Sequence, residues 1–300
     1  MYKRQQFDGA GGEPGSKSIM NDDASIRSWA TGATVQRGKL QINQTDNSLP
    51  TLGDESSAIG PYDHSVISLG DSGVVTLSFA EPISNNEGYD FAVFENGFAV
   101  GLSYFLELAH VEVSENGTDF VRFPSESLSD TGLQTDNFGY TDPTKLRNLA
   151  GKHQAPYGTL FDLEEVGLEE VNFVRLVDVV GSVIDSLGSR DSKGRIINDP
   201  WPTPFASSGF DLDAVAVVNG SVLKREEQTL SGVRIYPSLA RVNETIHIEA
   251  PQGTIIQVSN IQGKEVLSST QVTINLSQSG MYFVRLTNNG KVYTQKIVVR

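Results

Sequence analysis

The sequence predicts an all-β protein that consists of a large β-sandwich followed by a small one. Two observations support this prediction. From about residue 19 onward, short apolar runs alternate with turn residues such as Gly, Pro, Asn and Asp. Only two segments, Asp22–Ala30 and Leu163–Val171, have a pattern compatible with a helix. Many short strands separated by turns are typical of sandwiches and jelly rolls.

The composition sets limits on the class of protein. The 300 residues suffice for one large or two ordinary domains, and an apolar share of 38% suffices for a packed core. Cysteine is absent, which excludes disulfides, thiolate metal sites and cysteine nucleophiles. No apolar run approaches the roughly 18 residues that a membrane span needs. We therefore expect no membrane span.

The net charge of −14 is unevenly distributed. Residues 232–300 hold seven Lys or Arg against three Glu, and residues 221–231 are balanced, so residues 1–220 carry −18. A body this acidic repels phosphate backbones, so we expect no nucleic-acid partner. The ordinary interpretation of the acidity is solubility, and the alternative is binding of divalent cations by carboxylates.

The body of the protein extends from residue 19 to residue 220. Asn116-Gly117, between two alternating runs, is a strong hairpin signal. Two long polar stretches, 124–165 and 181–209, are expected to form a surface at one end of the sandwich, because loops of this length are usually functional or mobile. The predicted strands cover residues 76–79, 89–95, 105–113, 120–123, 171–180 and 210–218.

Three other segments complete the predicted organisation. The Gly-rich residues 1–18 are expected to be an N-terminal tail, and without an apolar run they are not a secretory signal peptide. The polar residues 221–232 are expected to be a linker. Residues 233–300 are expected to form a second, self-contained unit, a small immunoglobulin- or fibronectin-like β-sandwich. Its predicted strands cover residues 233–236, 245–249, 255–261, 272–276, 281–287 and 291–299.

The C-terminal unit resembles the type A sorting domain of the type IX secretion system. Val233-Arg-Ile-Tyr-Pro-Ser238 resembles its opening, and Gly280-Met-Tyr-Phe-Val-Arg285 and Lys296-Ile-Val-Val299 resemble its closing strands. One departure is Ser238-Leu239, where the family usually has Asn-Pro. The resemblance implies export by that machinery to the medium or outer surface of a Gram-negative bacterium. The alternative is an ordinary fibronectin-like accessory domain.

The body resembles galactose-binding-like jelly rolls. Val111–Arg122 is similar to a hairpin of that fold, and Phe210–Val217 is similar to its terminal strand. In several sugar-binding relatives an Asp at the position of Asp213 holds a structural calcium. Asp90–Phe98 and Asn198–Phe205 are also similar to an uncharacterised family of bacterial cell-surface proteins, which supplies no activity.

Carboxylates inside the apolar strands point to a cation. By period-two alternation, Glu95 shares a face with Phe91 and Val93. A carboxylate on a buried face is costly unless it is paired or ligated. We therefore predict a calcium site at Asp213. The weaker candidate ligands are Asp211, Glu95 and Asn96. The alternative for Glu95, Glu107, Asp178, Asp211 and Asp213 is exposure at a strand end or pairing with Arg122 or Arg175. Asp185, Asp191 and Asp199 are expected to be solvated.

Three aromatic residues in the polar stretches are candidate ligand-binding residues, namely Tyr157, Trp201 and Phe205. Exposed loop rings often stack on sugars or on planar ligands. The alternative is that these rings anchor their own loops to the sandwich.

Catalytic residues are not identifiable. The four histidines lack zinc-ligand spacing, and neither a Gly-x-Ser-x-Gly elbow nor a phosphate-binding glycine loop occurs. We therefore expect a secreted or surface binding or adhesion module for glycan or another extracellular ligand. One alternative is an enzyme that acts on extracellular polysaccharide. Another is an accessory surface protein of nutrient uptake, for example of corrinoids.

Overall fold

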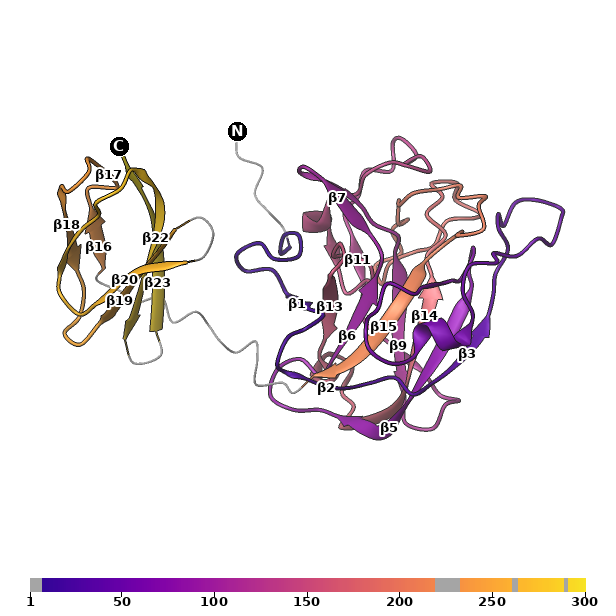
Figure 1. Ribbon diagram of the computed structural model, residues 1–300. Helices are drawn as coiled ribbons and strands as arrows, with labels where there is room; N and C mark the ends of the chain where they lie inside the picture. The colour runs from indigo at the N-terminus through magenta and orange to yellow at the C-terminus, as the bar shows by residue number, and fades with distance from the viewer. Residues whose placement is uncertain (1–6, 219–232, 261–263, 289–290) are drawn as a thin grey trace. The chain divides into compact units, whose positions relative to one another are not determined.

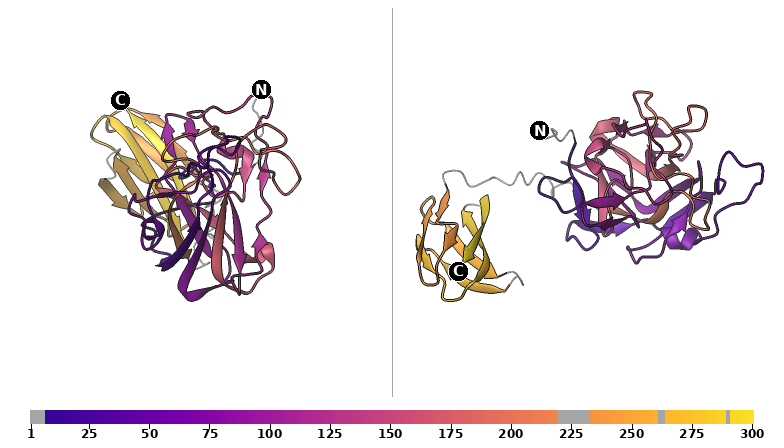
Figure 2. Two further views of the ribbon diagram at one scale, coloured as in Figure 1. Left: turned by 90° about the vertical axis from the view of Figure 1, so that its right-hand side faces the viewer. Right: turned by 90° about the horizontal axis from the view of Figure 1, so that it is seen from above.

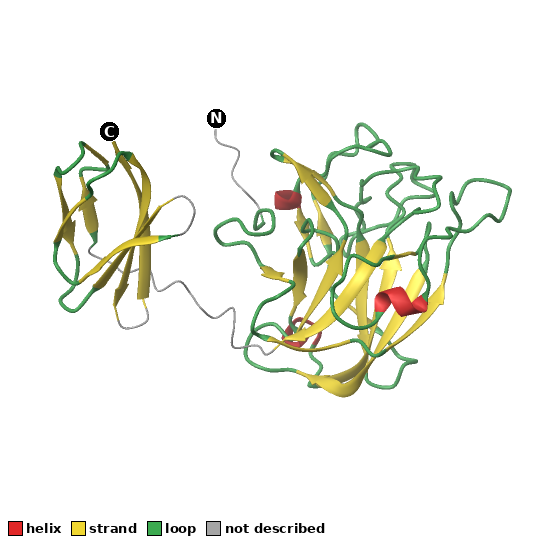
Figure 3. Ribbon diagram, viewed as in Figure 1, coloured by secondary structure: helices red, strands yellow, loops and turns green. Residues whose placement is uncertain are grey.

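The computed structural model describes residues 7–218, 233–260, 264–288 and 291–300. The chain divides into two compact units, Met1–Lys224 and Arg225–Arg300 (Figure 1). The predicted linker, 221–232, lies outside the described residues. Strands and loops make up nearly all of both units (Figure 3), so the all-β prediction is confirmed. The helices of the described residues are short 3-10 turns at Glu55–Ala58 (η1), Pro143–Lys145 (η2) and Leu163–Val166 (η3). None of them is long and apolar enough to cross a membrane.

The first unit is a sandwich of two antiparallel sheets, seen from two further directions in Figure 2. The first sheet has the order β1 (Ser18–Met20), β13 (Tyr157–Phe161), β6 (Phe91–Glu95), β15 (Asp211–Val218) and β2 (Ile26–Trp29), with β4 (Ile67–Ser68) also paired to β15. The second has the order β10 (Val121–Arg122), β9 (Ala109–Ser114), β14 (Glu170–Asp178), β5 (Val74–Ser84) and β3 (Gly32–Gln36).

The main core lies between these two sheets. Phe91 and Val93 of the first sheet belong to the same buried cluster as Val111 and Leu176 of the second. Phe91 and Phe161 stack with their ring centroids 5.2 Å apart. The outer face of the first sheet is also covered, since Phe94 belongs to a separate buried cluster. Strand β6 is therefore buried on both faces, which explains why its sequence is a continuous apolar run rather than an alternation.

The Asn-Gly hairpin prediction is confirmed. Strand β10 pairs with β9, with Val121 opposite Val113. Gly117 adopts a positive φ of 76°, and the Asn116 side chain accepts the backbone N–H of Thr118 at 2.9 Å. This is the turn chemistry that glycine and asparagine supply most readily.

Two predictions of local structure were wrong. Asp22–Ala30 contains strand β2, because pairing with β15 outweighs the helical pattern of the segment. Leu163–Val171 holds the single turn η3, which ends at Gly167 with a left-handed φ of 68°, and then the first two residues of β14. The predicted strand 105–113 is divided between β9 and β8 (Ser103–Phe105), which pairs with β7 (Phe98–Val100). Strands β11 (Glu126–Ser127) and β12 (Leu146–Arg147) lie within a stretch predicted as loop.

The N-terminal segment belongs to the body in its described part, residues 7–18. Ala10 is buried, and Gly11 passes so close to Tyr157 that a Cβ atom would lie 2.5 Å from the Cβ of that residue. The tail prediction therefore does not hold for residues 7–18. The Gly-rich sequence predicted a tail because it contains few apolar residues. In the structure, glycine without a Cβ atom allows the backbone to approach an aromatic ring.

Hydrogen bonds connect the two long loops of the body. Asn198 donates from Nδ2 to the carbonyl oxygens of Asp130 and Leu133, at 2.6 and 2.8 Å. Gln134 donates from Nε2 to the carbonyl oxygen of Gly181 at 3.0 Å. The loop 181–209 lies at the end of the strands that is uppermost in Figure 1.

The second unit is a small sandwich with its own core. One sheet has the order β16 (Arg234–Tyr236), β18 (Thr245–Glu249) and β21 (Thr273–Asn275). The other has the order β17 (Leu239–Ala240), β23 (Lys291–Val299), β22 (Gly280–Asn288), β19 (Ile255–Asn260) and β20 (Glu265–Ser269). Burial alternates strictly along β18, as expected for strands with one face on a core. Strands β17 and β20 were not predicted.

Candidate functional site

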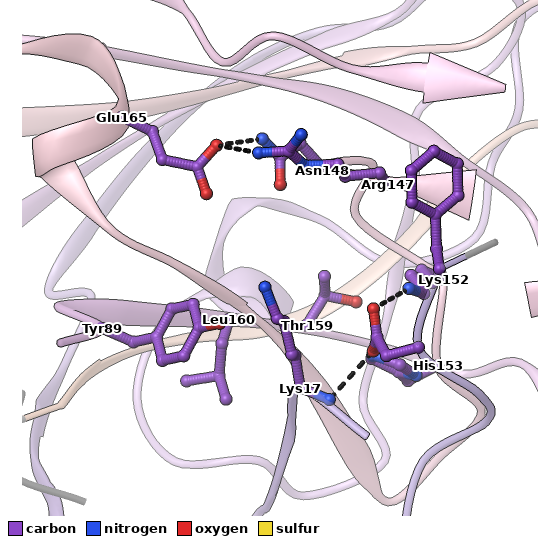
Figure 4. Close-up of a pocket in the computed structure, with 11 residues that line it drawn as sticks. Lys17, Tyr89, Arg147, Asn148, Lys152, His153, Thr159, Leu160 and Glu165 are labelled. Carbon is purple, nitrogen blue, oxygen red and sulfur yellow. Dashed lines mark hydrogen bonds and ion pairs between the residues drawn. The ribbon is translucent and has the colours of Figure 1, made fainter. Parts of the chain in front are cut away.

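A cavity in the body, which we call the Lys152 pocket, has a volume of about 460 Å³. It lies between the N-terminal segment, the edge of the first sheet and the loop after β12 (Figure 4). Its lining combines charged, polar and aromatic side chains. The lining residues are Phe7, Asp8, Lys17, Tyr89, Arg147, Asn148, Lys152, His153, Thr159, Leu160 and Glu165.

A buried ion pair forms one wall of the pocket. The Nζ atom of Lys152 lies 2.5 Å from Oδ1 of Asp8, and the Lys152 side chain is only 3% exposed. The other carboxylate oxygen of Asp8 accepts the backbone N–H of Lys17 at 2.9 Å. Burial raises the pKa of Asp8, but the charge and hydrogen bond of Lys152 outweigh burial, so this pKa is lowered. Asp8 therefore remains an anion and holds the N-terminal segment to the pocket.

His153 and Thr159 line the same cavity, and both carry buried polar atoms without partners. Neither ring nitrogen of His153 has a hydrogen-bond partner, and its Nε2 lies 3.7 Å from Oδ2 of Asp8. Burial, together with the charge of Lys152, lowers the pKa of His153 to about 3, so the ring is neutral at pH 7. The Oγ1 atom of Thr159 is also buried and unpartnered. Buried polar groups without partners are costly and rare in native proteins.

The opposite wall carries planar groups. Asn148 donates to Oε2 of Glu165 at 2.6 Å, and Arg147 lies 3.2 Å from the same oxygen. Figure 4 shows these three side chains together, with Tyr89 across the pocket from Lys152. An aromatic ring beside planar hydrogen-bonding groups suits a ligand with an apolar face and several hydroxyl groups.

The three aromatic residues selected from the sequence do not line the Lys152 pocket. Trp201 is 6% exposed, and its Nε1 donates to Oδ2 of Asp71 at 3.0 Å. This ring is closed to a ligand and anchors its loop, as the alternative predicted. Tyr157 lies under the N-terminal segment. Phe205 remains 39% exposed and stacks on Phe138, with the ring centroids 5.7 Å apart.

A second constellation lies inside the body, and we call it the acidic row. Each member is at most 6% exposed. Burial raises the pKa of Glu95, Glu107, Asp178 and Asp199 well above the ordinary value, and the charges of other members raise it further. Burial likewise raises the pKa of Asp211 and of Asp213 to about 6. The members are Asp71, Glu95, Glu107, Asp178, Asp199, Asp211 and Asp213.

The structure brings the predicted metal residues onto two neighbouring strands, because Glu95 of β6 pairs with Leu212 of β15. Asp211 is satisfied by the hydroxyl of Ser68 and by Asn96, whose Nδ2 donates at 3.0 Å. In contrast, Oε1 of Glu95 is buried without a partner.

Asp213 lies at the register shift between Leu212 and Ala214. Its Oδ1 accepts the backbone N–H of Asp63 at 3.2 Å, whereas its Oδ2 is buried without a partner. Glu95 and Asp213 therefore each offer a free oxygen to a cation, and Asp211 and Asn96 bind each other. Among the described residues, no three acidic or histidine side chains are arranged to hold a metal by themselves. A calcium ion beside Asp213 would therefore also need backbone carbonyl and water oxygens.

Among the described residues, no arginine forms an ion pair with a member of the acidic row. Arg122 and Arg175, the partners considered from the sequence, both bind Glu112 instead. The expectation of solvation holds for Asp185, whose side chain is 89% exposed. It was wrong for Asp191 and Asp199, which are 5% and 2% exposed. Asp191 is buried against Arg195, 2.6 Å away, whereas Asp199 has no such partner.

The fold and these sites define an all-β protein with a polar pocket in its body. Residues 234–300 match the family described as the secretion system C-terminal sorting domain. The C-terminal unit is therefore a sorting domain of the type IX secretion system. The protein is delivered by that system to the cell surface or outside the cell, as the sequence resemblance predicted.

Similarity to solved structures is weak. The surface component PorZ of the type IX system of Porphyromonas gingivalis is 17% identical over 29% of this chain and 14% of its own, with a TM-score of 0.21. The β-glucuronidase of Faecalibacterium prausnitzii is 13% identical over 94% of this chain and 46% of its own, with a TM-score of 0.28. The chain thus spans less than half of either protein. At these scores neither similarity bears on function. No curated protein matches the chain.

Proposed function

We propose that the protein is an extracellular binding module, and that its ligand, a glycan or another polyhydroxylated molecule, binds in the Lys152 pocket. The observation that supports this proposal is the cavity of about 460 Å³ whose lining residues include Thr159 and His153, both of which carry buried polar atoms without partners. Sites for small molecules typically have volumes of about 300–1,000 Å³ with a few convergent polar groups. Because the sorting domain directs export, the ligand should be a molecule found outside the cell.

Sugar chemistry fits these atoms. A sugar hydroxyl both donates and accepts a hydrogen bond, so it can satisfy the Thr159 hydroxyl and a neutral His153 ring. The ring of Tyr89 offers an apolar face for the C–H side of a pyranose. Glu165, Asn148 and Arg147 already hold one another in place, which reduces the entropy cost of ordering them on binding.

The alternative of a polysaccharide-degrading enzyme is less well supported. Glycoside hydrolysis usually needs one carboxylic acid with a raised pKa and a second carboxylate across the scissile bond. In the pocket, the Lys152 charge lowers the pKa of Asp8 despite burial, and Glu165 is bound by Arg147 and Asn148. The carboxylates with raised pKa are the members of the acidic row and Asp90, and all of them are closed to solvent. The volume also suits one or two sugar rings better than a corrinoid.

The test of the binding function is a glycan array on the full chain, followed by calorimetric titration of the best ligand. Thr159→Val keeps the side-chain shape but removes the unpartnered hydroxyl, and should lower affinity at least tenfold. Thr141→Val is the matched control, because Oγ1 of Thr141 is also buried and unpartnered but lies outside the pocket. Loss of binding in Phe205→Ala with full binding in Thr159→Val would assign the ligand to the loop aromatics instead.

We also propose a structural calcium beside Asp213 as part of this module. Two unpartnered buried oxygens support it, namely Oδ2 of Asp213 and Oε1 of Glu95. Bound calcium would hold β6 and β15 together at the end of the first sheet, away from the residues of the Lys152 pocket.

A further inference from the structure

Lys17 brings a positive charge to the Lys152 pocket from the N-terminal segment. It directly precedes strand β1, in which Ser18 pairs with Thr159 of β13. Its backbone N–H donates to Oδ2 of Asp8 at 2.9 Å. The backbone of Lys17 is therefore held between the strand that carries Thr159 and the buried ion pair, whereas the residue as a whole is exposed.

The Lys17 side chain extends into the pocket, between Tyr89 and Lys152 in the view of Figure 4. Its ammonium group acts on the hydroxyl of Tyr89, because burial raises the pKa of Tyr89 while the charge and hydrogen bond of Lys17 lower it. Burial outweighs the lysine, so the pKa of Tyr89 is raised and the hydroxyl is neutral at pH 7. A neutral hydroxyl does not balance the charge of the ammonium group.

The carboxylates of the pocket are already paired with other cations. Lys152 binds Asp8, and Arg147 binds Glu165. Within the described part of the chain, no ion pair includes Lys17. The pocket thus has three Lys or Arg side chains against two carboxylates, and its histidine is neutral. Since residues 1–220 carry −18, an excess of cations in the pocket runs against the composition of the body and favours an anion there.

Hydrogen-bond chemistry also favours an anion with two acceptor oxygens. The ammonium group of Lys17 only donates, and the buried hydroxyl of Thr159 has no partner. A carboxylate only accepts, so one of its oxygens suits Lys17 and the other suits Thr159. Hydrogen bonds between charged groups are shorter and stronger than neutral ones. A neutral sugar would satisfy Thr159 and leave the charge of Lys17 unbalanced.

We propose that the Lys152 pocket binds a sugar that carries a carboxylate, and that Lys17 is the residue that selects it. This inference rests on the proposed function and names the class of glycan. The single uncompensated lysine suits one negative charge, whereas a phosphate monoester carries about two at pH 7. The acidic body repels a long polyanion, so the ligand should be an isolated acidic sugar in an otherwise neutral glycan.

The experiment compares acidic glycans with neutral glycans of nearly the same shape. The full chain is applied to an array of glycans that end in one glucuronic, galacturonic or sialic acid, each printed beside its uncharged methyl ester. Sulfated glycans form a third set. We expect the acids to bind and the esters not to bind. Increasing sodium chloride should weaken the binding of the acids, because salt screens an exposed charge.

Calorimetric titration of the best acidic glycan then tests Lys17. Lys17→Met should weaken binding about ten- to hundredfold, which corresponds to the loss of one hydrogen bond to a charged group, and should remove most of the salt dependence. Lys17→Arg keeps the charge and should keep most of the affinity. The matched control is Lys39→Met, which removes a lysine outside the pocket and should bind as the wild type does. Thermal melts check that all variants fold, and the bond from the Lys17 backbone to Asp8 does not need the lysine side chain.

The outcomes separate this inference from the proposed function. If the esters bind as tightly as the acids and Thr159→Val abolishes their binding, the binding function stands and the selection of a carboxylate is overturned. The inference is also overturned if Lys17→Met binds the acids as the wild type does, or if only the sulfated glycans bind. If no glycan of any set binds, the proposed function fails and this inference fails with it.

Discussion

Asp8 and Lys152 are 144 residues apart in the sequence and form a buried ion pair, with 2.5 Å between Oδ1 and Nζ. Their side chains are 12% and 3% exposed. The pair attaches the N-terminal segment to the loop after β12 and encloses one side of the Lys152 pocket. Through this ion pair, the N-terminal segment becomes part of the body and of its candidate site, although the segment contains few apolar residues.

Asp8→Asn should therefore destabilise the body strongly. It leaves the Lys152 ammonium buried without its counter-charge, and breaking a buried pair from one side typically costs about 3–5 kcal/mol. Adding Lys152→Met should recover most of this loss, because both charges are then removed. Urea unfolding of the single and double variants measures the coupling. The exposed pair Asp185–Arg190 is the control, and Asp185→Asn should cost less than about 1 kcal/mol. Equal effects of Asp8→Asn and Asp185→Asn would contradict a buried pair.

His153 should make the body less stable in acid. Burial lowers its pKa to about 3 in the folded state, against an ordinary value of 6.5. Between pH 3 and 6.5 the unfolded state binds more protons, so the contribution of His153 to folding is complete above pH 6.5 and decreases as the pH falls. His153→Gln, which does not titrate, should lose less stability than the wild type between pH 7 and pH 4. Unfolding free energies at four pH values test this, with the exposed His64→Asn as control. An unchanged slope in His153→Gln would contradict the prediction.

Calcium should stabilise the body through Asp213. An ion that binds the folded state only, at about one hundred times its dissociation constant, adds roughly 2.7 kcal/mol. For a body of this size, the melting temperature should rise by about 5–10 °C, at roughly 2–4 °C per kcal/mol. Asp213→Ala should reduce the difference between calcium and EDTA, and this interaction between mutation and metal is the quantity to measure. Identical melting of the wild type in calcium and in EDTA would exclude a stabilising ion.

Deletion of residues 234–300 should abolish export and leave the body folded. The sorting domain lies entirely in these residues, and the two units have separate buried cores. The truncated chain should accumulate inside the native host, and its purified body should unfold cooperatively in a thermal melt. Appearance of the truncated protein in the medium at the level of the full chain would show that these residues are not the export signal.

The sequence by itself determined the local features of this protein. Period-two alternation placed β18 and β23 at their observed bounds, and Asn116-Gly117 placed the turn between β9 and β10. These signals are short-range, because side-chain direction alternates along any strand and a tight turn needs particular residues. The sorting domain could also be predicted, since its motifs keep their order and spacing within residues 233–300.

Only the tertiary structure decided which polar residues are buried and what they meet. Asp199 was expected in solvent and lies in the acidic row, and Trp201 was expected at the surface and donates to Asp71. Asp8 contacts Lys152 although most of the body's sequence lies between them, and no local sequence pattern indicates that either residue is paired. The physical reason is that the burial and pairing of a charge depend on chain segments that approach from far away in the sequence, whereas alternation and turns depend on immediate neighbours.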